Sequence, residues 1–177
     1  MINIAKERKG QDVALDSYRA RLDTITDEQF TTSPPDGGWS YAEVYSHILQ
    51  ATLAASVGLE RCTQKNDDVY TKGFNFVGWA ILFFGRFPPV KVKVPESINA
   101  KIPAVKMSKE DAKNMIVKCR KRIEDITPLI KNSSPHSRNK HPRLGMLNAG
   151  QWFKFLRIHL EHHLKQLNRI ENTFKNA

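Results

Sequence analysis

Three of the chain's six histidines lie within five positions of the segment RIHLEHHLKQLNRI, at His159, His162 and His163. Successive residues of an α-helix are turned by about 100°, so His159 and His163 would lie one turn apart, about 40° from each other. His162 falls about 60° to the other side, toward Lys165 and Arg169, and we expect it to be exposed. Two imidazoles spaced i, i+4 on a helix can converge on one transition-metal ion.

The apolar residues of this segment decide which helix face lies inside. They recur at helical spacing and form one stripe, with His159 and His163 at its centre. Gln166 continues the stripe, where its amide could orient a ligand or a bound water. The competing interpretation is that both histidines are packed core residues, each satisfied by a hydrogen bond. The stripe consists of Trp152, Phe155, Leu156, Leu167, Ile170 and Phe174.

A third histidine, His47, lies at the edge of the apolar face of a second predicted helix. Its neighbours on that face, Ala51 and Ala54, are small and leave room beside it. Three neutral imidazoles with an open position make the catalytic kind of metal site rather than the structural kind. A divalent ion there would lower the pKa of a bound water toward about 7, or accept a thiolate. We therefore expect His47, His159 and His163 to bind one divalent ion.

The sequence supplies no unambiguous general base, and no catalytic residue is assigned beyond the metal centre. Glu43 lies one turn before His47, but it is also placed to cap its own helix, and Glu161 points away from the apolar stripe. His141 precedes the last helix and could reach the mouth of the site. As a loop residue before a proline, it is more typical of a turn.

Four segments have the apolar spacing of amphipathic helices, and we expect these helices to begin near residues 10, 41, 108 and 149. Ser40 with Glu43, and Asn148 with Gln151, have the spacing of capping boxes. Four long helices in 177 residues predict an all-α four-helix bundle, formed by one domain that spans residues 1–177. The polar segment KNSSPHSRNKHPRLGM is expected to be a loop, with His136 exposed.

Residues 65–107 form an insertion between the second and third predicted helices. We expect a short helix at 74–85 and a long crossover, which permits an order other than simple up-and-down. Only VKVKV, at 90–94, has the alternating pattern of a strand. The apolar run FNFVGWAILFFG is too short to span a bilayer. It carries more aromatic side chains than one short helix can bury in its own bundle, so we expect a homodimer.

Composition limits the class of protein and of partner. The formal charge is +10, but the Lys and Arg residues are scattered without interleaved aromatics, so we expect no nucleic-acid partner. The two cysteines, Cys62 and Cys119, lie in no CxxC pair and indicate buried thiols in a reducing compartment. The first residues contain no apolar run of the kind found in signal peptides. We therefore expect a cytoplasmic protein.

Two segments of the chain resemble the DinB-like superfamily of metal-dependent enzymes. They are PPDGGWSYAEVYSHILQA and HPRLGMLNAGQWFKFLRIHLEHHLKQLNRI. The family pattern is a GWS helix start, a histidine seven residues later, and a late HxxxH. In this chain the pattern corresponds to Trp39 and Ser40, then His47, then His159 with His163. The insertion at 65–107 has no counterpart that we can match.

The resemblance implies a four-helix bundle of the YfiT-like type, in which three histidines bind a divalent ion, usually zinc or nickel. The superfamily includes hydrolases and thiol-dependent S-transferases that use bacillithiol or mycothiol. We therefore expect a metal-dependent enzyme that activates water or a low-molecular-weight thiol toward a small-molecule substrate. The competing hypothesis is a non-catalytic helical bundle that binds a metal or a ligand.

Overall fold

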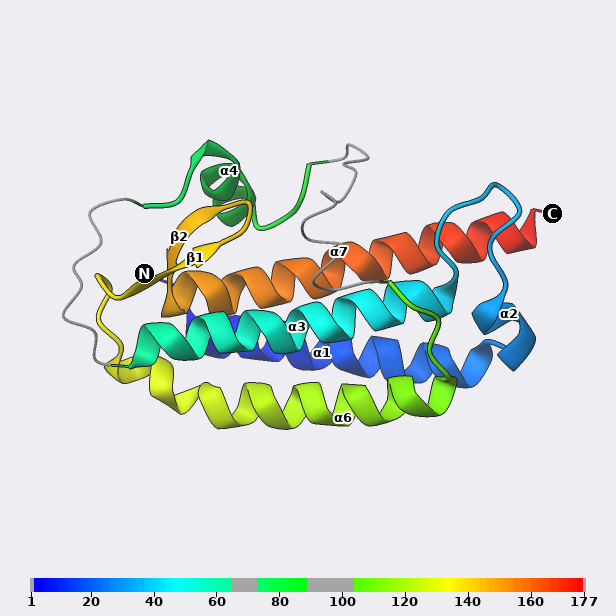
Figure 1. The fold of residues 1–177 in the computed structure, drawn as a ribbon, viewed down its shortest axis with the longest axis horizontal. Coiled ribbons are helices and arrows are strands. Elements are labelled where there is room, and N and C mark those ends of the chain that lie inside the picture. Colours follow the sequence, from blue (N-terminus) through cyan, green and yellow to red (C-terminus); the bar gives the residue numbers. More distant parts are fainter. Residues whose placement is uncertain (1, 65–72, 89–103, 177) are drawn as a thin grey trace.

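Four long helices lie side by side in the computed structural model, which describes residues 2–64, 73–88 and 104–176 (Figure 1). The prediction of an all-α four-helix bundle is confirmed. The last three helices begin within one residue of the expected positions, but the first begins earlier than expected. Asn3 caps it by accepting a hydrogen bond from the backbone N–H of Lys6 (3.0 Å), a start that the apolar spacing alone does not reveal. The four helices are α1 (Ile4–Thr24), α3 (Tyr41–Thr63), α6 (Lys109–Ile126) and α7 (Ala149–Lys175).

The order of the helices is not a simple up-and-down one. In Figure 1, α1 and α7 run in one direction, whereas α3 and α6 both run in the other. Helix α7 packs against α1 and α3, and α6 packs against the same two helices on the opposite side. Because α3 and α6 are parallel, the end of α3 and the start of α6 lie at opposite ends of the bundle. This separation agrees with the long crossover expected between the second and third long helices, most of which lies outside the described residues.

Both predicted capping boxes are present and fix where the two histidine-bearing helices begin. The Ser40 hydroxyl accepts a hydrogen bond from the Glu43 N–H, while the Glu43 carboxylate accepts one from the Ser40 N–H (2.8 Å). Asn148 and Gln151 make the equivalent pair at the start of α7. Each box satisfies two backbone donors that a helix start otherwise leaves unpaired. These starts determine on which face of α3 His47 lies and on which face of α7 His159 lies.

The expectation of a plain loop before α7 is wrong. Strands β1 (Arg138–His141) and β2 (Gly145–Asn148) form an antiparallel hairpin there. Phe74 makes an isolated bridge with Gly145, and the Met146 N–H donates to the Gly73 carbonyl at 3.2 Å. The hairpin thus depends on pairing with a segment about 70 residues earlier, a contact that local sequence does not reveal. The VKVKV segment at 90–94 lies outside the described residues.

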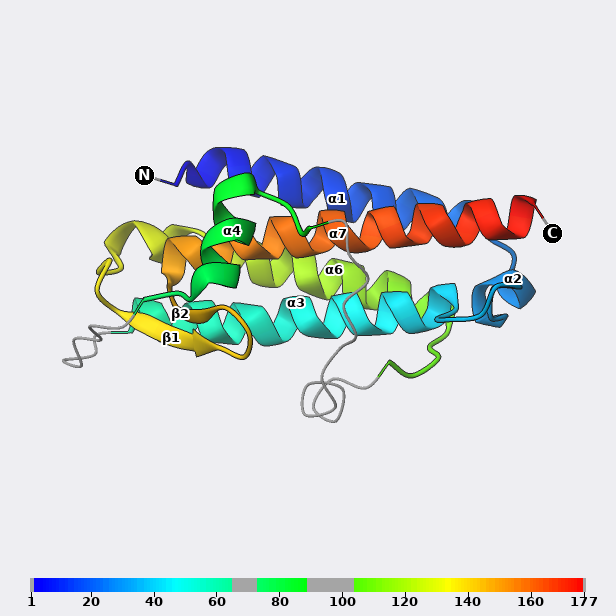
Figure 2. The same ribbon diagram turned by 90° about the horizontal axis from the view of Figure 1, so that it is seen from above.

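The insertion contains the expected short helix, α4 (Phe76–Phe84), which begins at its cap Asn75. Ile81 and Leu82 are buried, but all four aromatic side chains of α4 are exposed, as expected for a helix with too many rings to bury. Figure 2 shows α4 lying across the outside of α7. Short helices α2 (Asp27–Thr31) and η1 (Pro128–Asn132) complete the described elements. None of the described helices is both long enough and apolar enough to cross a membrane.

Candidate metal centre

Helix α7 places His159 and His163 one turn apart on its inward face. The apolar stripe that includes Trp152, Phe155 and Leu156 is buried, and the two imidazoles lie within it. His163 is 6 % exposed, and His159 is partly buried. Their Nε2 atoms are 3.1 Å apart, and their ring centroids are 4.8 Å apart. The i, i+4 spacing therefore brings the two imidazole edges together, as the helical geometry predicts.

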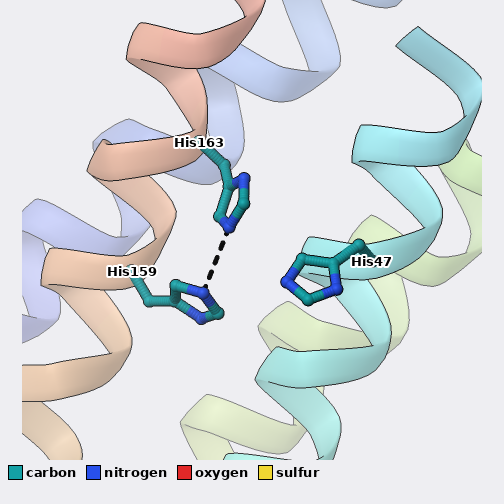
Figure 3. A group of neighbouring side chains, drawn as sticks. All are labelled: His47, His159 and His163. Atoms are coloured by element: carbon teal, nitrogen blue, oxygen red, sulfur yellow. Dashed lines mark hydrogen bonds between the residues drawn. The ribbon is translucent and has the colours of Figure 1, made fainter. Parts of the chain in front are cut away.

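Helix α3 brings His47 to the same point from the other side of the core. Its side chain is 5 % exposed, and its ring centroid lies 5.0 Å from that of His163 and 5.8 Å from that of His159. Figure 3 shows His47 facing the two α7 histidines across the space between the helices. One ring nitrogen from each residue can be chosen so that all three lie within 4.8 Å of one another.

This spacing fits a shared metal ion. In a tetrahedral site, or at adjacent positions of an octahedral one, two nitrogens bound to one ion at about 2.0–2.2 Å lie about 2.8–3.6 Å apart. The Nε2 atoms of His159 and His163, 3.1 Å apart, already have this spacing. A nitrogen pair at the 4.8 Å limit would have to approach by about 1 Å, through rotation of the rings. All three candidate ligands are imidazole nitrogens. Zinc, nickel and copper bind such nitrogens well, whereas the hard ions magnesium and calcium prefer oxygen ligands.

Burial keeps the α7 imidazoles in the form that binds metal. It lowers the pKa of His163 to about 3, with a further contribution from the neighbouring His47 and His162. The pKa of His159 lies well below its usual value, first because of burial and then because of His163 and His47. Both rings are therefore neutral near pH 7, and a neutral imidazole has a lone pair for an ion.

Gln166 orients one of the three imidazoles. His163 Nδ1 donates a hydrogen bond to Gln166 Oε1 at 2.8 Å. This bond places the ring proton on Nδ1 and leaves the Nε2 lone pair directed toward His159. Such a partner behind a ligating imidazole fixes both the tautomer and the ring orientation. Gln166 thus lies where the sequence placed it, one turn beyond His163 on the same face.

Aromatic rings enclose the imidazoles, a feature that the metal-ligand pattern alone did not reveal. The Trp39 ring lies against His47, with centroids 5.1 Å apart, and the Phe155 ring stacks on His159 at 5.2 Å. Phe87, just after α4, has its ring centroid 5.9 Å from that of His159. Phe155 could have been found from its spacing of four residues before His159. Phe87 could not, because nothing local connects the insertion to α7.

His162 is not exposed, so that expectation is wrong. Its ring is half-buried, with its centroid 4.5 Å from that of Phe87. Burial, followed by the charges of Arg169 and Lys165, lowers its pKa to about 4. The ring does point toward those two cations, and it is not among the three histidines that converge. Helical geometry therefore predicted the direction of the His162 side chain correctly. It could not predict that Phe87 covers this side chain, because the sequence did not show where the insertion lies.

The other predicted pocket residues have separate roles in the fold. Glu43 is engaged in the α3 capping box. His141 ends β1, and its Nδ1 accepts hydrogen bonds from the backbone N–H groups of Arg143 and Leu144, at 3.1 Å each. It is therefore the turn element that its position before a proline indicates. Its ring packs on that of Phe155 with centroids 4.5 Å apart, so Phe155 lies between His141 and His159. His136 is exposed, as expected.

The two cysteines are buried thiols, as expected. Burial raises the pKa of Cys62 to about 11 and that of Cys119 to about 12, so neither is a thiolate near pH 7. The Cys62 thiol donates to the Gly58 carbonyl at 3.3 Å, and the Cys119 thiol donates to the Leu49 carbonyl at 3.5 Å. Neither residue is therefore a candidate nucleophile.

Cavities among the described residues differ in what they could hold. One of about 480 Å³ lies along the first half of α1 and beside η1, where no histidine or cysteine lines it. A cavity of about 30 Å³, with room for about one water, lies between Phe87 and His162. The carboxylates that line the larger cavity, Asp12 and Asp16, are paired with Arg8 and Arg120, so the convergent imidazoles remain the best candidate site.

Comparison with known proteins supports this assignment of the fold. The model of the DinB superfamily matches residues 12–167. The structure of TT2238, described as a four-helix bundle protein, superposes with a TM-score of 0.61 at 15 % identity and covers 94 % of this chain and 99 % of that chain. YfiT from Bacillus subtilis, described as a probable metal-dependent hydrolase with an unusual four-helix bundle topology, gives 0.62 at 12 %, covering 97 % and 87 %. No curated protein matches the sequence.

Proposed function

The chain belongs to the DinB superfamily, and we propose that it is a metal-dependent enzyme that acts on a small molecule. In this proposal His47, His159 and His163 hold one divalent ion, zinc or nickel, and leave at least one position for water or substrate. The observation that carries the proposal is the convergence of the three imidazoles from two helices, within 4.8 Å of one another. A core that needed only packing would bury apolar side chains at these positions, because a buried imidazole must also satisfy two nitrogens.

The residues around the three histidines support a preorganised site. Gln166 holds His163 in one tautomer, Trp39 limits the rotation of His47, and Phe155 limits that of His159. Ligands held in this way lose little conformational freedom when they bind an ion. The low exposure of His47 and His163, 5 and 6 %, strengthens electrostatic interactions inside the site. A divalent ion bound there would lower the pKa of a water or of a thiol that shares it.

Two reactions fit this arrangement: transfer of a low-molecular-weight thiol to an electrophile, and hydrolysis. Hydrolysis benefits from a general base near the nucleophile, and the nearest candidates by sequence are already engaged. Glu43 caps α3, and Glu161 pairs with Arg157 at 2.6 Å. A thiol needs less help because it ionises more readily than water. These contacts favour S-transfer, while the description of YfiT as a probable hydrolase favours hydrolysis.

The competing function is a non-catalytic bundle that binds a metal or a ligand. The first test is the metal content of protein purified without a histidine tag, measured by elemental analysis before and after incubation with zinc or nickel. We expect about one equivalent of metal. Less than about a tenth of an equivalent, with no uptake on addition, would refute the metal site.

The second test separates the reactions. Metal-loaded protein is assayed with a panel of low-molecular-weight thiols and electrophiles, and separately with simple esters and amides. Protein in which His163→Ala removes one ligand serves as the matched negative control. Turnover that depends on metal and on added thiol supports S-transfer, and turnover without thiol supports hydrolysis. Full metal loading with no turnover in either panel would favour the binding module.

A further inference from the structure

Helix α4 presents a group of aromatic rings to solvent. Phe76, Trp79, Phe83 and Phe84 are 79, 42, 67 and 61 % exposed, and we call these four side chains the aromatic face of α4. The rings pack on one another: Trp79 stacks on Phe76 and on Phe83, with centroid distances of 5.8 and 5.1 Å. Four large rings gathered on one nine-residue helix are unusual for a surface that faces only water.

The opposite side of α4 is fixed to the hairpin. Ile81 and Leu82 are 3 and 8 % exposed. The Asn75 side chain accepts a hydrogen bond from the Gly78 N–H and donates one to the Arg143 carbonyl. The backbone of α4 at Gly78 lies so close to the hairpin that a Cβ on Gly78 would be 2.5 Å from the Leu144 carbonyl oxygen. The aromatic face is therefore held outward by a packed inner side, on the outside of the bundle (Figures 1 and 2).

All the charged side chains of the two segments that form this surface are basic. Residues 73–88 and the hairpin region 138–148 contain Arg86, Arg138, Lys140 and Arg143, and no Asp or Glu. Arg86 directly follows the last turn of α4. Arg143 lies beside the first turn, where its carbonyl accepts the hydrogen bond from Asn75. Arg86, Lys140 and Arg143 are exposed. Glu161 of α7 lines a small cavity with Arg86, but its carboxylate pairs with Arg157 at 2.6 Å. Among the described residues, the aromatic face therefore has an excess of positive charge at its two ends. Such a face is complementary to a membrane surface, in which an anionic layer covers an apolar one.

We propose that the aromatic face of α4 docks on the surface of a bilayer that contains anionic phospholipids. Aromatic side chains partition to the boundary between headgroups and acyl chains, and flanking Lys and Arg residues bind the lipid phosphates. The helix is nine residues long, so it lies in the interface and does not cross it. The overall charge of +10 attracts the whole chain to such a surface.

A bilayer fits this surface better than either of two other occupants. A second copy of the chain, the homodimer expected from sequence, would bring the same cations toward one another across a two-fold axis. Single-stranded nucleic acid requires exposed ring faces on which bases can stack. Here the faces of Phe76, Trp79 and Phe83 are directed at one another. The docking surface uses none of the three histidines, so it goes beyond the proposed enzymatic function and can fail without affecting it.

The test is co-sedimentation of the full chain with large unilamellar vesicles. One set contains phosphatidylcholine with about a third phosphatidylglycerol, and the other contains phosphatidylcholine alone. We expect binding to the anionic vesicles that is at least about tenfold stronger than to the neutral ones and that weakens as salt is raised. A blue shift of tryptophan fluorescence on binding should be lost in Trp79→Phe, because Trp152 is buried and Trp39 is half-buried against His47. Absent or equal binding to the two vesicle types would overturn the proposal.

Two variants identify the surface. Phe83→Ser with Phe84→Ser should weaken vesicle binding at least about tenfold, whereas the exposed Val117→Ser on α6 should not. Arg86→Glu with Arg143→Glu should weaken it at least about tenfold, more than the same charge change at the exposed Lys118 and Lys121. All substituted side chains are exposed, so circular dichroism and metal content should match those of the parent. Equal losses in variants and controls would overturn the assignment of the surface.

Two further results would replace the bilayer with another partner. Light scattering could show a dimer that the Phe83→Ser and Phe84→Ser substitutions dissociate. A labelled oligothymidylate could bind in a way that depends on the same two rings. Either result, with no vesicle binding, would overturn the proposal.

Discussion

The ring of Phe155 stacks on the imidazole of His159, with centroids 5.2 Å apart and planes inclined by 24°. The two residues lie one helical turn apart on α7, so the contact is built into a single element. Phe155 is also in contact with the His141 ring from the hairpin, at 4.5 Å. The orientation of one candidate metal ligand is thereby linked to the packing of the hairpin against α7.

We expect Phe155→Leu to weaken zinc binding several-fold while leaving the stoichiometry unchanged. Leucine fills most of the volume but does not hold the imidazole plane, so His159 must lose more rotational freedom when it binds an ion. Competition with a chromophoric chelator measures the affinity. Phe153→Leu is the matched control, because Phe153 is fully buried on another face of α7. Equal affinity losses in the two variants would show a general effect of core packing.

Gln166→Leu should lower zinc affinity by about 10–100-fold. Leucine removes the acceptor for His163 Nδ1, which is 2.8 Å from Gln166 Oε1, so the ring no longer has a fixed tautomer. Gln166→Glu retains an acceptor and should bind zinc at least as tightly as the parent. The same chelator competition distinguishes them. If the leucine and glutamate variants bound zinc equally, the orienting role of Gln166 would be wrong.

The parts of the fold that the sequence predicted are those specified by local interactions. Ser40 with Glu43, and Asn148 with Gln151, are capping pairs three residues apart, and they set the starts of α3 and α7 correctly. From those starts, helical geometry determines which side chains face inward. The side of α7 that carries His159 and His163 was therefore predictable, as was the crossover between α3 and α6.

The parts that the sequence did not predict depend on contacts between distant segments. The hairpin at 138–148 is stabilised by pairing with Gly73 and Phe74. The burial of His162 depends on Phe87, 75 positions earlier in the sequence. Neither contact leaves a periodic pattern, because each involves one or two residues of an insertion without a repeat. The apolar stripe gave the direction of His162 but could not show what covers it.

Acid should destabilise the fold partly through His141. Burial, and then the charge of Arg143, lowers the pKa of His141 to about 4, whereas the unfolded value is about 6.5. The unfolded chain therefore takes up a proton first, and the free energy of unfolding falls as pH falls from about 6.5 to about 4. His141→Asn removes the titration but keeps an acceptor for the two turn N–H groups. Between pH 7 and 5, urea denaturation should show a decline smaller by about 1–2 kcal/mol in His141→Asn. An unchanged decline would contradict this role.

Gly145→Ala should destabilise the fold more than Gly37→Ala does. Both glycines have positive φ, +87° and +82°, so alanine is strained at each by a similar amount, about 1 kcal/mol. A Cβ at Gly145 would also lie 2.8 Å from the Asn75 nitrogen, whereas nothing lies within 4 Å of one at Gly37. The difference between the two variants in urea denaturation measures the cost of separating the hairpin from residues 73–75. A difference of zero would mean that this contact contributes nothing to stability.

The last prediction concerns the ligand set and uses alanine substitutions at four histidines. His47→Ala, His159→Ala and His163→Ala should each lower zinc affinity by orders of magnitude, because each removes one of three ligands and no carboxylate or thiolate of the described residues converges with them. His162→Ala is the matched control on the same helix. It removes a half-buried ring that lies beside His163 and Phe87, but it removes no convergent nitrogen, so affinity should change only a few-fold. Elemental analysis after dialysis against a weak chelator measures the bound metal. Loss of metal from His162→Ala and its retention in His163→Ala would show that the ion lies on the other side of α7. Retention by all four variants would leave three buried, hydrogen-bonded imidazoles with no metal to explain their convergence.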